Sequence, residues 1–562
     1  MILAKYVLIS DTTLSHDYRN FPLLDFLPSA PTEFLPNFLY KYLKGKPPPD
    51  INGRASSATY PLRKLEASLL QRHTSDEVVV AHEDHFEDFI TDDTEIIGVT
   101  TMDPLGIAPL TMSYTLFFGT SGMAYVRKEF FSLLERINRV RKGKKAKLVV
   151  GGPGVWELTV HPEEMNNLNI DYAFQGESED IINELFDYIL DGSSRSSAFF
   201  KGFQTFDNDY HKSWIGDERF ISRYQFSRQF PKLEDIPEIV NPTIKGLIEV
   251  MRGCGVGCDF CEVTLRPLRY YPPEKVRKEI EVNVKAGRGE AWLHSDEIFA
   301  YQHGRNFEPN YEALTELFKW VMETKGVTHT NPTHGRISIP AAYPDLVRNI
   351  SEIIHAGPDN WIGLQVGVET GSDRLAKIHM PNKTLPLKIG PDGSWQDIVS
   401  QGTYVMNKYY WRPAFTVQVG QASENDEDNW ETVALINRMS NSEVDGHPFE
   451  FTITPMQNVP LGLLKSKDFS DFAISESQLA VYYASYRHLA KVASRDAFRN
   501  GRNGRDRSIL SVFGTGMLVS LGGRAMLHTV ARVCKKHGLD LEKAATYGVD
   551  RKLPQAPSIP AM

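Results

Sequence analysis

The chain has 562 residues, with 62 Lys and Arg against 71 Asp and Glu, and only 4 Cys. At about 100–200 residues per domain, this length implies several domains and excludes a small single-fold protein. Four cysteines are too few for a disulfide scaffold in so long a chain. A net charge of −9 argues against general nucleic-acid binding, because such proteins need a basic face to neutralise phosphates.

We expect no export signal in the N-terminal segment. Residues 6–9 (YVLI) predict a short strand, without the apolar core or cleavage site of a signal peptide. An uncharged run at residues 508–523 is shorter than the ~20 apolar residues that cross a bilayer, and it contains four glycines. We therefore expect a cytoplasmic protein with no membrane span, in a reducing compartment where thiols stay available to metals.

Strand and helix patterns alternate in a first block. Residues 96–100, 147–150 and 170–174 predict strands, and the apolar stripe across residues 124–143 predicts an amphipathic helix. Alternation of this kind is typical of a parallel sheet. Glycines follow the second and third of these strands, and the carboxyl ends of parallel strands are where such sheets bind ligands.

A polar, aromatic-rich connector at residues 191–241 leads to a second block with six candidate strands. They are residues 247–252, 291–294, 327–338, 361–368, 413–420 and 449–455, with helical stripes between them. Six successive β/α units predict a partial barrel with its chemistry at the carboxyl ends of the strands.

The chain after residue 466 is mainly helical. It includes a basic segment that is either a solvated loop or a clamp for carboxylates or phosphates. The arginines of this segment are Arg495, Arg499, Arg502, Arg505 and Arg507. Residues 509–521 predict either a core helix or the lining of an apolar channel.

Three cysteines lie in one glycine-rich loop directly after the first strand of the second block. Cys254, Cys258 and Cys261 are separated by three and two residues, and clustered thiolates suit zinc or iron–sulfur. Zinc takes a fourth ligand, and the remaining cysteine, Cys534, is far along the chain. Three thiolates without a fourth predict a [4Fe–4S] cluster with one iron open to a substrate or cofactor. We expect Cys534 to be a buried apolar residue or a thiol near the substrate.

The stretch from Met251 to Cys261 (MRGCGVGCDFC) resembles the cluster loop of the radical S-adenosylmethionine (SAM) superfamily. Residues 295–299 (SDEIF) and 367–372 (GVETGS) resemble later landmarks of that family, in the expected order. The resemblance implies four SAM-binding residues, Phe260, Asp296, Glu297 and Glu369. Residues 419–424 (VGQASE) stand where the family often has Gly-x-Pro-x-Glu, so the absence of the proline implies a different loop shape.

Simpler interpretations exist for some of these positions. Asp296 and Glu297 can cap the helix that follows them. Glu369 lies in an apolar strand, where a carboxylate is costly without a partner, so a ligand-facing role is favoured. His294 and His334, at strand ends, face substrate or are satisfied core residues, and we favour the second.

The first block resembles the cobalamin-binding domain that precedes many radical SAM domains. The resemblance rests on residues 98–101 (GVTT), 149–154 (VVGGPG) and 171–179 (DYAFQGESE). It implies cobalamin contacts from Thr101, Asp103, Leu105, Gly151, Gly152, Pro153, Gly176 and Glu177. Many cobalamin proteins use Asp-x-His-x-x-Gly, whose His binds cobalt from below. Here Leu105 takes the place of that His, so we expect no protein nitrogen on the lower face of the cobalt, with Tyr114 a less favoured neighbour.

Together these resemblances imply a cobalamin-dependent radical SAM C-methyltransferase that uses a [4Fe–4S] cluster, SAM and methylcobalamin. A 5′-deoxyadenosyl radical would abstract hydrogen from an unactivated carbon, which would then take the methyl group. We expect a monomer with an external ferredoxin- or flavodoxin-like electron donor. The expected substrate is a peptide or protein side chain or backbone, for example in methyl-coenzyme M reductase.

Two alternatives stay open. One is a radical SAM enzyme that forms carbon–carbon bonds or rings on a lipid or other small molecule. The other is a cobalamin-binding or electron-transfer module without turnover of its own. The expected fold is α/β in either case. It has a Rossmann-like cobalamin-binding domain (1–200), a linker (201–242), a partial (β/α)6 radical SAM barrel (243–465) and a mainly helical C-terminal domain (466–562).

Overall fold

The computed structural model describes residues 4–16, 18, 22–45, 47–118, 123–191, 224–226, 230–391, 393–459, 461, 464, 474–496 and 509–550. Two compact units are present. Unit 1 comprises Met1–Thr111, Gly119–Ile248 and Tyr271–Gly289, and unit 2 comprises Met112–Phe118, Glu249–Tyr270 and Glu290–Met562. Most of the connector, and the arginines of the basic segment other than Arg495, lie outside the described residues.

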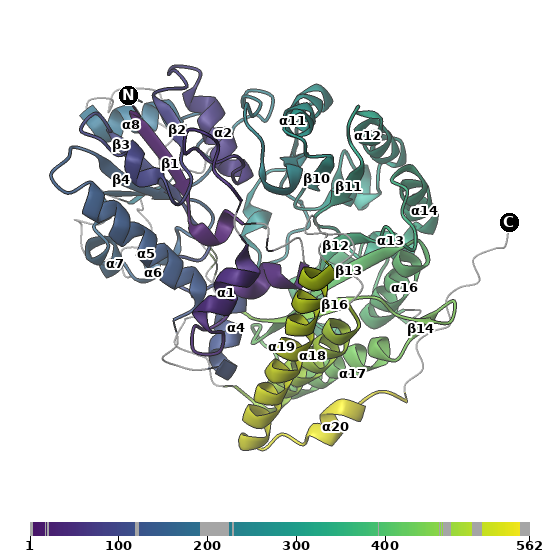
Figure 1. The fold of residues 1–562 in the computed structure, drawn as a ribbon. Coiled ribbons are helices and arrows are strands. Elements are labelled where there is room, and N and C mark those ends of the chain that lie inside the picture. Colours follow the sequence, from purple (N-terminus) through teal and green to yellow (C-terminus); the bar gives the residue numbers. More distant parts are fainter. Residues whose placement is uncertain are drawn as a thin grey trace. The chain divides into compact units, whose positions relative to one another are not determined.

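Unit 1 is built on a six-stranded parallel sheet of order β2-β1-β3-β4-β5-β6 (Figure 1). Its strands are β1 (Tyr6–Ser10), β2 (Val78–Val80), β3 (Ile96–Thr100), β4 (Lys147–Gly151), β5 (Tyr172–Gln175) and β6 (Tyr224–Phe226). The expected parallel sheet is confirmed. Strands β2 and β6 are not among the expected ones, because runs of three residues carry little periodicity.

Helices cover this sheet on both sides. All residues of β1 and of β3 are buried, as expected for parallel strands with two covered faces. One face packs against α2 (Tyr60–Leu69) and α8 (Ile182–Asp191), and Figure 1 shows α5 (Tyr125–Val140) along the other. The other helices of this unit are α1 (Asn37–Lys44), α3 (Phe86–Phe89), α6 (Glu157–Val160), α7 (Glu163–Asn167) and α11 (Pro273–Lys285).

The long strands of unit 2 form parallel pairs. Strand β10 (Glu290–His294) pairs with β11 (His329–Pro332), and β12 (Ile362–Glu369) pairs with β13 (Trp411–Val419), which pairs with β16 (Thr452–Gln457). A single bridge, His334 to Gln365, links the β10–β11 pair to the β12–β13–β16 sheet. The expected barrel strands are thus present, but they form sheets joined at one point instead of one continuous sheet.

Short strands and helices complete unit 2. The strands are β7 (Leu247–Glu249), whose last residue belongs to this unit, then β8 (Met251–Arg252), β9 (Arg269–Tyr270), β14 (Glu443–Val444) and β15 (His447–Pro448). The helices are α12 (Tyr311–Glu323), α13 (Ser338–Ala342), α14 (Pro344–Ile353), α15 (Asp373–His379), α16 (Trp395–Lys408), α17 (Asp426–Ser440), α18 (Glu476–Asp496), α19 (Ile509–Lys536) and α20 (Leu541–Thr546). Helix α4 (Pro109–Phe118) begins in unit 1 and continues in unit 2.

Three expectations differ from the structure in detail. The strand expected at residues 327–338 is only β11, because Pro332 ends the strand and α13 begins at Ser338. Helix α11 belongs to unit 1, although it lies within the range expected for the barrel. The C-terminal helices group with the barrel strands in unit 2, so a separate C-terminal domain stays a prediction.

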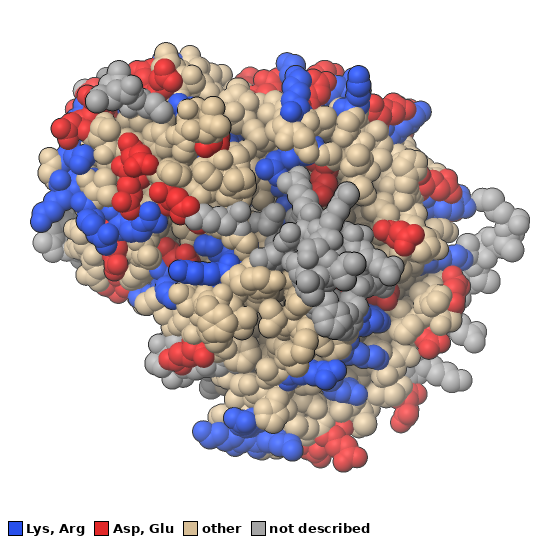
Figure 2. Space-filling view, in the orientation of Figure 1, with Lys and Arg blue, Asp and Glu red and all other residues tan. Residues whose placement is uncertain are grey.

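The described helices include none that is both long and apolar enough to cross a membrane. On the face shown in Figure 2, Lys and Arg side chains are interspersed with Asp and Glu, as on a solvated protein surface.

Candidate functional site

The cysteine loop runs from the end of β8 to the short helix η7 (Glu262–Leu265). Its three glycines, Gly253, Gly255 and Gly257, have φ values of +80°, +67° and +80°, in the left-handed region that disfavours other residues. A Cβ on Gly253 would lie 2.6 Å from the carbonyl oxygen of Pro267. Glycine is therefore required for this loop to fold back on itself.

The three thiols of the loop are shielded from solvent. Cys258 is buried, and Cys254 and Cys261 are partly buried. Burial raises the pKa of the Cys254 thiol to about 11 and that of Cys258 to about 12. No set of three His, Cys, Asp or Glu side chains among the described residues is arranged around a single metal ion. An iron–sulfur cluster binds its cysteines through different irons, so three soft donors spread over one loop fit such a cluster.

Side chains from later elements hold this loop in place. One carboxylate oxygen of Asp296 accepts a hydrogen bond from the Gly253 amide at 2.7 Å. The amide of Asn382 donates to the Val256 carbonyl oxygen at 3.0 Å. His379 lies 2.8 Å (Nδ1) from Oδ2 of Asp259, and its carbonyl oxygen accepts from the Asp259 amide at 3.1 Å. Asn382 and His379 carry no sequence signal for this role.

Glu369 and Phe260, two of the expected SAM residues, meet at a lysine that the sequence does not point to. The ammonium of Lys383 lies 2.8 Å from Oε1 of Glu369 and 5.9 Å from the centre of the Phe260 ring. Glu369 ends β12 with φ +65°. A Cβ on Gly367 would lie 2.0 Å from Oε1 of Glu369 and 2.5 Å from Nζ of Lys383. The glycine of the GVETGS segment therefore makes room for this ion pair.

Charges around Lys383 outweigh its burial. Burial alone lowers the pKa of this ammonium, but the Glu369 carboxylate and the thiols of Cys258 and Cys261 together raise it above its ordinary value. Lys383 is therefore a charged group inside the protein at neutral pH. Burial raises the thiol pKa of Cys258 and of Cys261. Lys383 lowers both pKa values, whereas Glu369 raises both, and the effect of the lysine is the larger.

Asp296 and Glu297 are adjacent in sequence but play different parts. The carboxylate of Glu297 is fully buried, lies 3.3 Å from Nε of Arg336 and accepts from the Phe299 amide at 3.2 Å. It caps the short helix η8 (Ile298–Ala300), as the simpler interpretation expects. Asp296 is only partly buried and faces the cysteine loop. Of the two, Asp296 is therefore the carboxylate placed beside the candidate cluster.

His294 and His334 lie at the carboxyl ends of β10 and β11, with ring centres 5.8 Å apart. Nδ1 of His334 lies 3.1 Å from the Ser295 carbonyl oxygen and 2.9 Å from Oγ1 of Thr333. Burial lowers the pKa of His334 to about 4, so its ring is neutral at physiological pH. His334 has protein hydrogen-bond partners, in keeping with the expected core role.

In unit 1 the order of strands locates the edge at which a ligand would bind. Strand β2 lies on one side of β1 and β3 lies on the other. The order of strands therefore reverses between β1 and β3, which flank a topological switch point. Open parallel sheets bind ligands beyond the carboxyl ends of strands at such a point. Residues expected to contact cobalamin follow β3, β4 and β5, which are neighbours in this sheet, and they therefore lie along one edge.

Two glycines after β4 pack tightly on the end of β3. The Thr101 amide donates to the Gly151 carbonyl oxygen at 3.0 Å, and the Gly154 amide donates to the Thr101 carbonyl oxygen at 3.1 Å. A Cβ on Gly152, whose φ is +99°, would lie 2.5 Å from Oγ1 of Thr100. A Cβ on Gly154 would lie 2.2 Å from the Met102 carbonyl oxygen. Gly152 and Pro153 are exposed at this edge, as are Gly176 and, in part, Glu177 at the end of β5.

The loop after β3 buries two of the residues that are expected to contact cobalamin. Leu105 is only 2% exposed, its amide donates to Oε2 of Glu157 at 2.7 Å, and Asp103 is buried beside it. Glu157 is a partner that the sequence does not indicate. Burial and the nearby Asp103 raise the pKa of Glu157 well above its ordinary value. Met102, with 55% of its surface exposed, is an apolar side chain that this loop presents to solvent.

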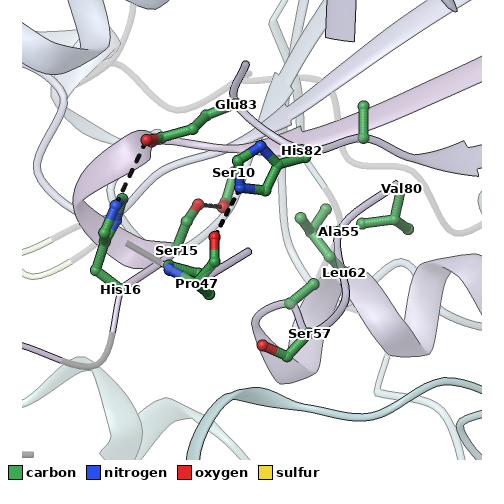
Figure 3. Close-up of a pocket in the computed structure, with 12 residues that line it drawn as sticks. Ser10, Ser15, His16, Pro47, Ala55, Ser57, Leu62, Val80, His82 and Glu83 are labelled. Carbon is green, nitrogen blue, oxygen red and sulfur yellow. Dashed lines mark hydrogen bonds and ion pairs between the residues drawn. The ribbon is translucent and has the colours of Figure 1, made fainter. Parts of the chain in front are cut away.

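A small cavity lies at the carboxyl ends of β1 and β2 (Figure 3). Ser10 and Ser15 face one another with their hydroxyl oxygens 2.6 Å apart, and His16 points toward Glu83, with Nε2 3.5 Å from Oε1. The cavity volume of about 20 Å³ matches one water molecule. In this form the cavity is too small for a cofactor.

Searches against known proteins return distant matches. No family model matches the chain. The chain is 26% identical over 151 residues to a tRNA-2-methylthio-N(6)-dimethylallyladenosine synthase from Orientia tsutsugamushi (strain Boryong), covering 26% of this chain and 32% of the relative. It is 22% identical over 243 residues to the enzyme of the same name from Bacillus velezensis, covering 43% of each. The match therefore spans less than half the length of these relatives.

Two solved structures of the radical S-adenosylmethionine methyltransferase TsrM from Kitasatospora setae are also similar. The one with cobalamin and a [4Fe–4S] cluster bound has 12% identity and a TM-score of 0.46, over 82% of this chain and 74% of that chain. The one with tryptophan and a SAM analogue bound has 13% identity and a TM-score of 0.45, over 76% and 70%.

Proposed function

We propose that this protein is a cobalamin-dependent radical SAM C-methyltransferase. The observation that carries the proposal is the cysteine loop, in which three shielded thiols lie on a backbone that only glycines allow. Asp296, Asn382 and His379 brace this loop from outside. Three soft donors without a fourth are the ligand set of a cluster with an open iron.

The residues of unit 2 divide the work of holding the cofactors. Cys254, Cys258 and Cys261 would hold the [4Fe–4S] cluster, and Phe260, Asp296 and Glu369 would contact SAM. Glu297 would act indirectly, because Arg336 and the Phe299 amide already occupy its carboxylate. When bound, these cofactors would supply two things. One is a radical that abstracts a hydrogen atom from the substrate, and the other is a methyl group for the carbon centre that results. The protein supplies position and protection, as expected where cofactors carry the chemistry.

In unit 1 the edge formed by β3, β4 and β5 would hold cobalamin. Gly151, Gly152 and Pro153 would lie against it, with Gly176 and Glu177 beyond. Thr101 supports the glycine turn through two backbone hydrogen bonds. Asp103 and Leu105 are buried and would shape the edge from beneath. We propose that exposed Met102, and no protein nitrogen, faces the cofactor from this loop.

The substrate proposed is an unactivated carbon of a peptide or protein, such as methyl-coenzyme M reductase. The enzyme would act as a cytoplasmic monomer with a ferredoxin- or flavodoxin-like electron donor. The test incubates the anaerobically reconstituted enzyme with methyl-deuterated SAM and peptides of that reductase. A product carrying the labelled methyl group supports methylation. A product that has lost two hydrogens and carries no label instead supports ring or carbon–carbon bond formation.

A further inference from the structure

Lys383 is a buried cation to which the proposed function so far assigns no task. Its side chain is 12% exposed, and its ammonium lies 2.8 Å from the Glu369 carboxylate. A buried lysine is costly unless it is paired, and Glu369 supplies that pairing. Besides this carboxylate, the ammonium faces Phe260 of the cysteine loop, with Nζ 5.9 Å from the centre of the ring.

The position of Lys383 relative to the cysteine loop is fixed on several sides. The preceding residue, Asn382, donates to the Val256 carbonyl oxygen at 3.0 Å. The hydroxyl of Ser338 donates to the carbonyl oxygens of Lys383 and Leu385, each at 2.9 Å. Gly367 leaves the space that the ammonium and its partner fill. These contacts therefore hold the ammonium at a fixed position inside the protein.

The other end of the loop has the opposite electrostatic surroundings. There the carboxylate of Asp296 accepts a hydrogen bond from the amide of Gly253, the residue before Cys254. Phe260, against which the Lys383 ammonium lies, stands between Cys258 and Cys261 in the sequence. A cluster held by the loop would have its positive neighbour on the side of Cys258 and Cys261.

We propose that Lys383 is a fixed positive charge that stabilises the reduced form of the cluster, with Glu369 limiting its effect. This inference rests on the proposed function. Reduction by one electron adds one negative charge to the cluster, and net charge and burial are among the factors that set the potentials of such clusters. A buried cation nearby stabilises the added charge more than an exposed one does, because solvent screens it less. Lys383 would thus make electron transfer from an external donor easier without touching the substrate.

The test is an anaerobic redox titration of the full-length reconstituted protein, without SAM, followed by the electron paramagnetic resonance signal of the reduced cluster. Leaving SAM out separates this role from contact with SAM. Lys383→Met should lower the ratio of reduced to oxidised cluster at the wild-type midpoint about tenfold, a shift of about 59 mV for one electron. Glu369→Gln should shift the ratio the opposite way, because it removes the opposing charge.

Two variants serve as matched controls. Lys383→Arg keeps the charge and should leave the ratio near the wild-type value. Lys377→Met removes an exposed lysine of α15 and should have no effect, since water screens that charge. Iron content is measured for every variant.

An unchanged midpoint in Lys383→Met with full iron content would overturn the inference. Loss of iron in both Lys383→Met and Lys383→Arg would also overturn it, because the residue would then serve the fold of the loop. A wild-type protein that takes up no iron would instead refute the proposed function, and the inference with it.

Discussion

Gly152 offers the sharpest test of the proposed cobalamin edge. Replacing it with alanine places a Cβ 2.5 Å from Oγ1 of Thr100 and 2.5 Å from the Thr101 carbonyl oxygen, distances that real Cβ atoms do not show. The φ of +99° adds strain, since L residues disfavour this conformation. The turn after β4 must therefore move away from the end of β3.

The size of the effect follows from these two costs. An alanine in the left-handed region costs about 1–2 kcal/mol, and overpacking adds about 1–3 kcal/mol. If the observed turn is the one that binds cobalamin, this cost appears in the binding free energy. Since 1.4 kcal/mol is a factor of ten, the dissociation constant should rise by roughly 30-fold or more.

Equilibrium dialysis of cobalamin against the purified protein measures this change. Gly143→Ala is the matched control, because Gly143 has φ +82° but nothing within 4 Å of its Cβ position. It carries the backbone strain without the collision and should bind cobalamin as the wild type does. A Gly152→Ala protein that binds cobalamin with wild-type affinity would refute the reasoning.

Three further predictions follow. Replacing any cysteine of the loop with alanine should abolish iron binding, which iron analysis measures. Cys534→Ala should retain the iron, because Cys534 is buried with its sulfur 3.7 Å from the Leu479 carbonyl oxygen. Burial lowers the pKa of His488 from 6.5 to about 3, so the unfolded chain takes up this proton first and stability should fall as pH drops from 6.5 towards 3. The thermal midpoint of His488→Gln should fall less over that range, and an equal fall would contradict the prediction. Bound cob(II)alamin should show no axial nitrogen splitting in its electron paramagnetic resonance spectrum, even in Leu105→His, because position 105 is buried.

The cysteine loop can be predicted from sequence because its chemistry is local. Three ligands lie within eight residues, and the glycines between them report the backbone that the loop needs. The residues that brace the loop are a different case. His379, Asn382 and Lys383 lie more than 100 positions away and reach the loop only through the fold, so no local pattern marks them.

At the strand ends, too, some features can be predicted from local sequence and others depend on the fold. Glycine after β4 and β5 predicts a ligand edge, and the structure places these residues along one side of the sheet. Leu105 is found by matching a motif, but whether its side chain or that of Met102 faces solvent depends on how the turn packs on Glu157. Periodicity likewise finds the barrel strands, whereas the single bridge between β11 and β12 depends on tertiary packing.

Metal analysis after anaerobic reconstitution tests the central proposal most directly. The purified chain is supplied with iron, sulfide and cobalamin, and bound iron, sulfide and cobalt are measured per protein. The proposal predicts about four iron and four sulfide for a [4Fe–4S] cluster, together with stoichiometric cobalt. A protein that binds zinc in place of the cluster, or that retains no cobalt, would contradict it.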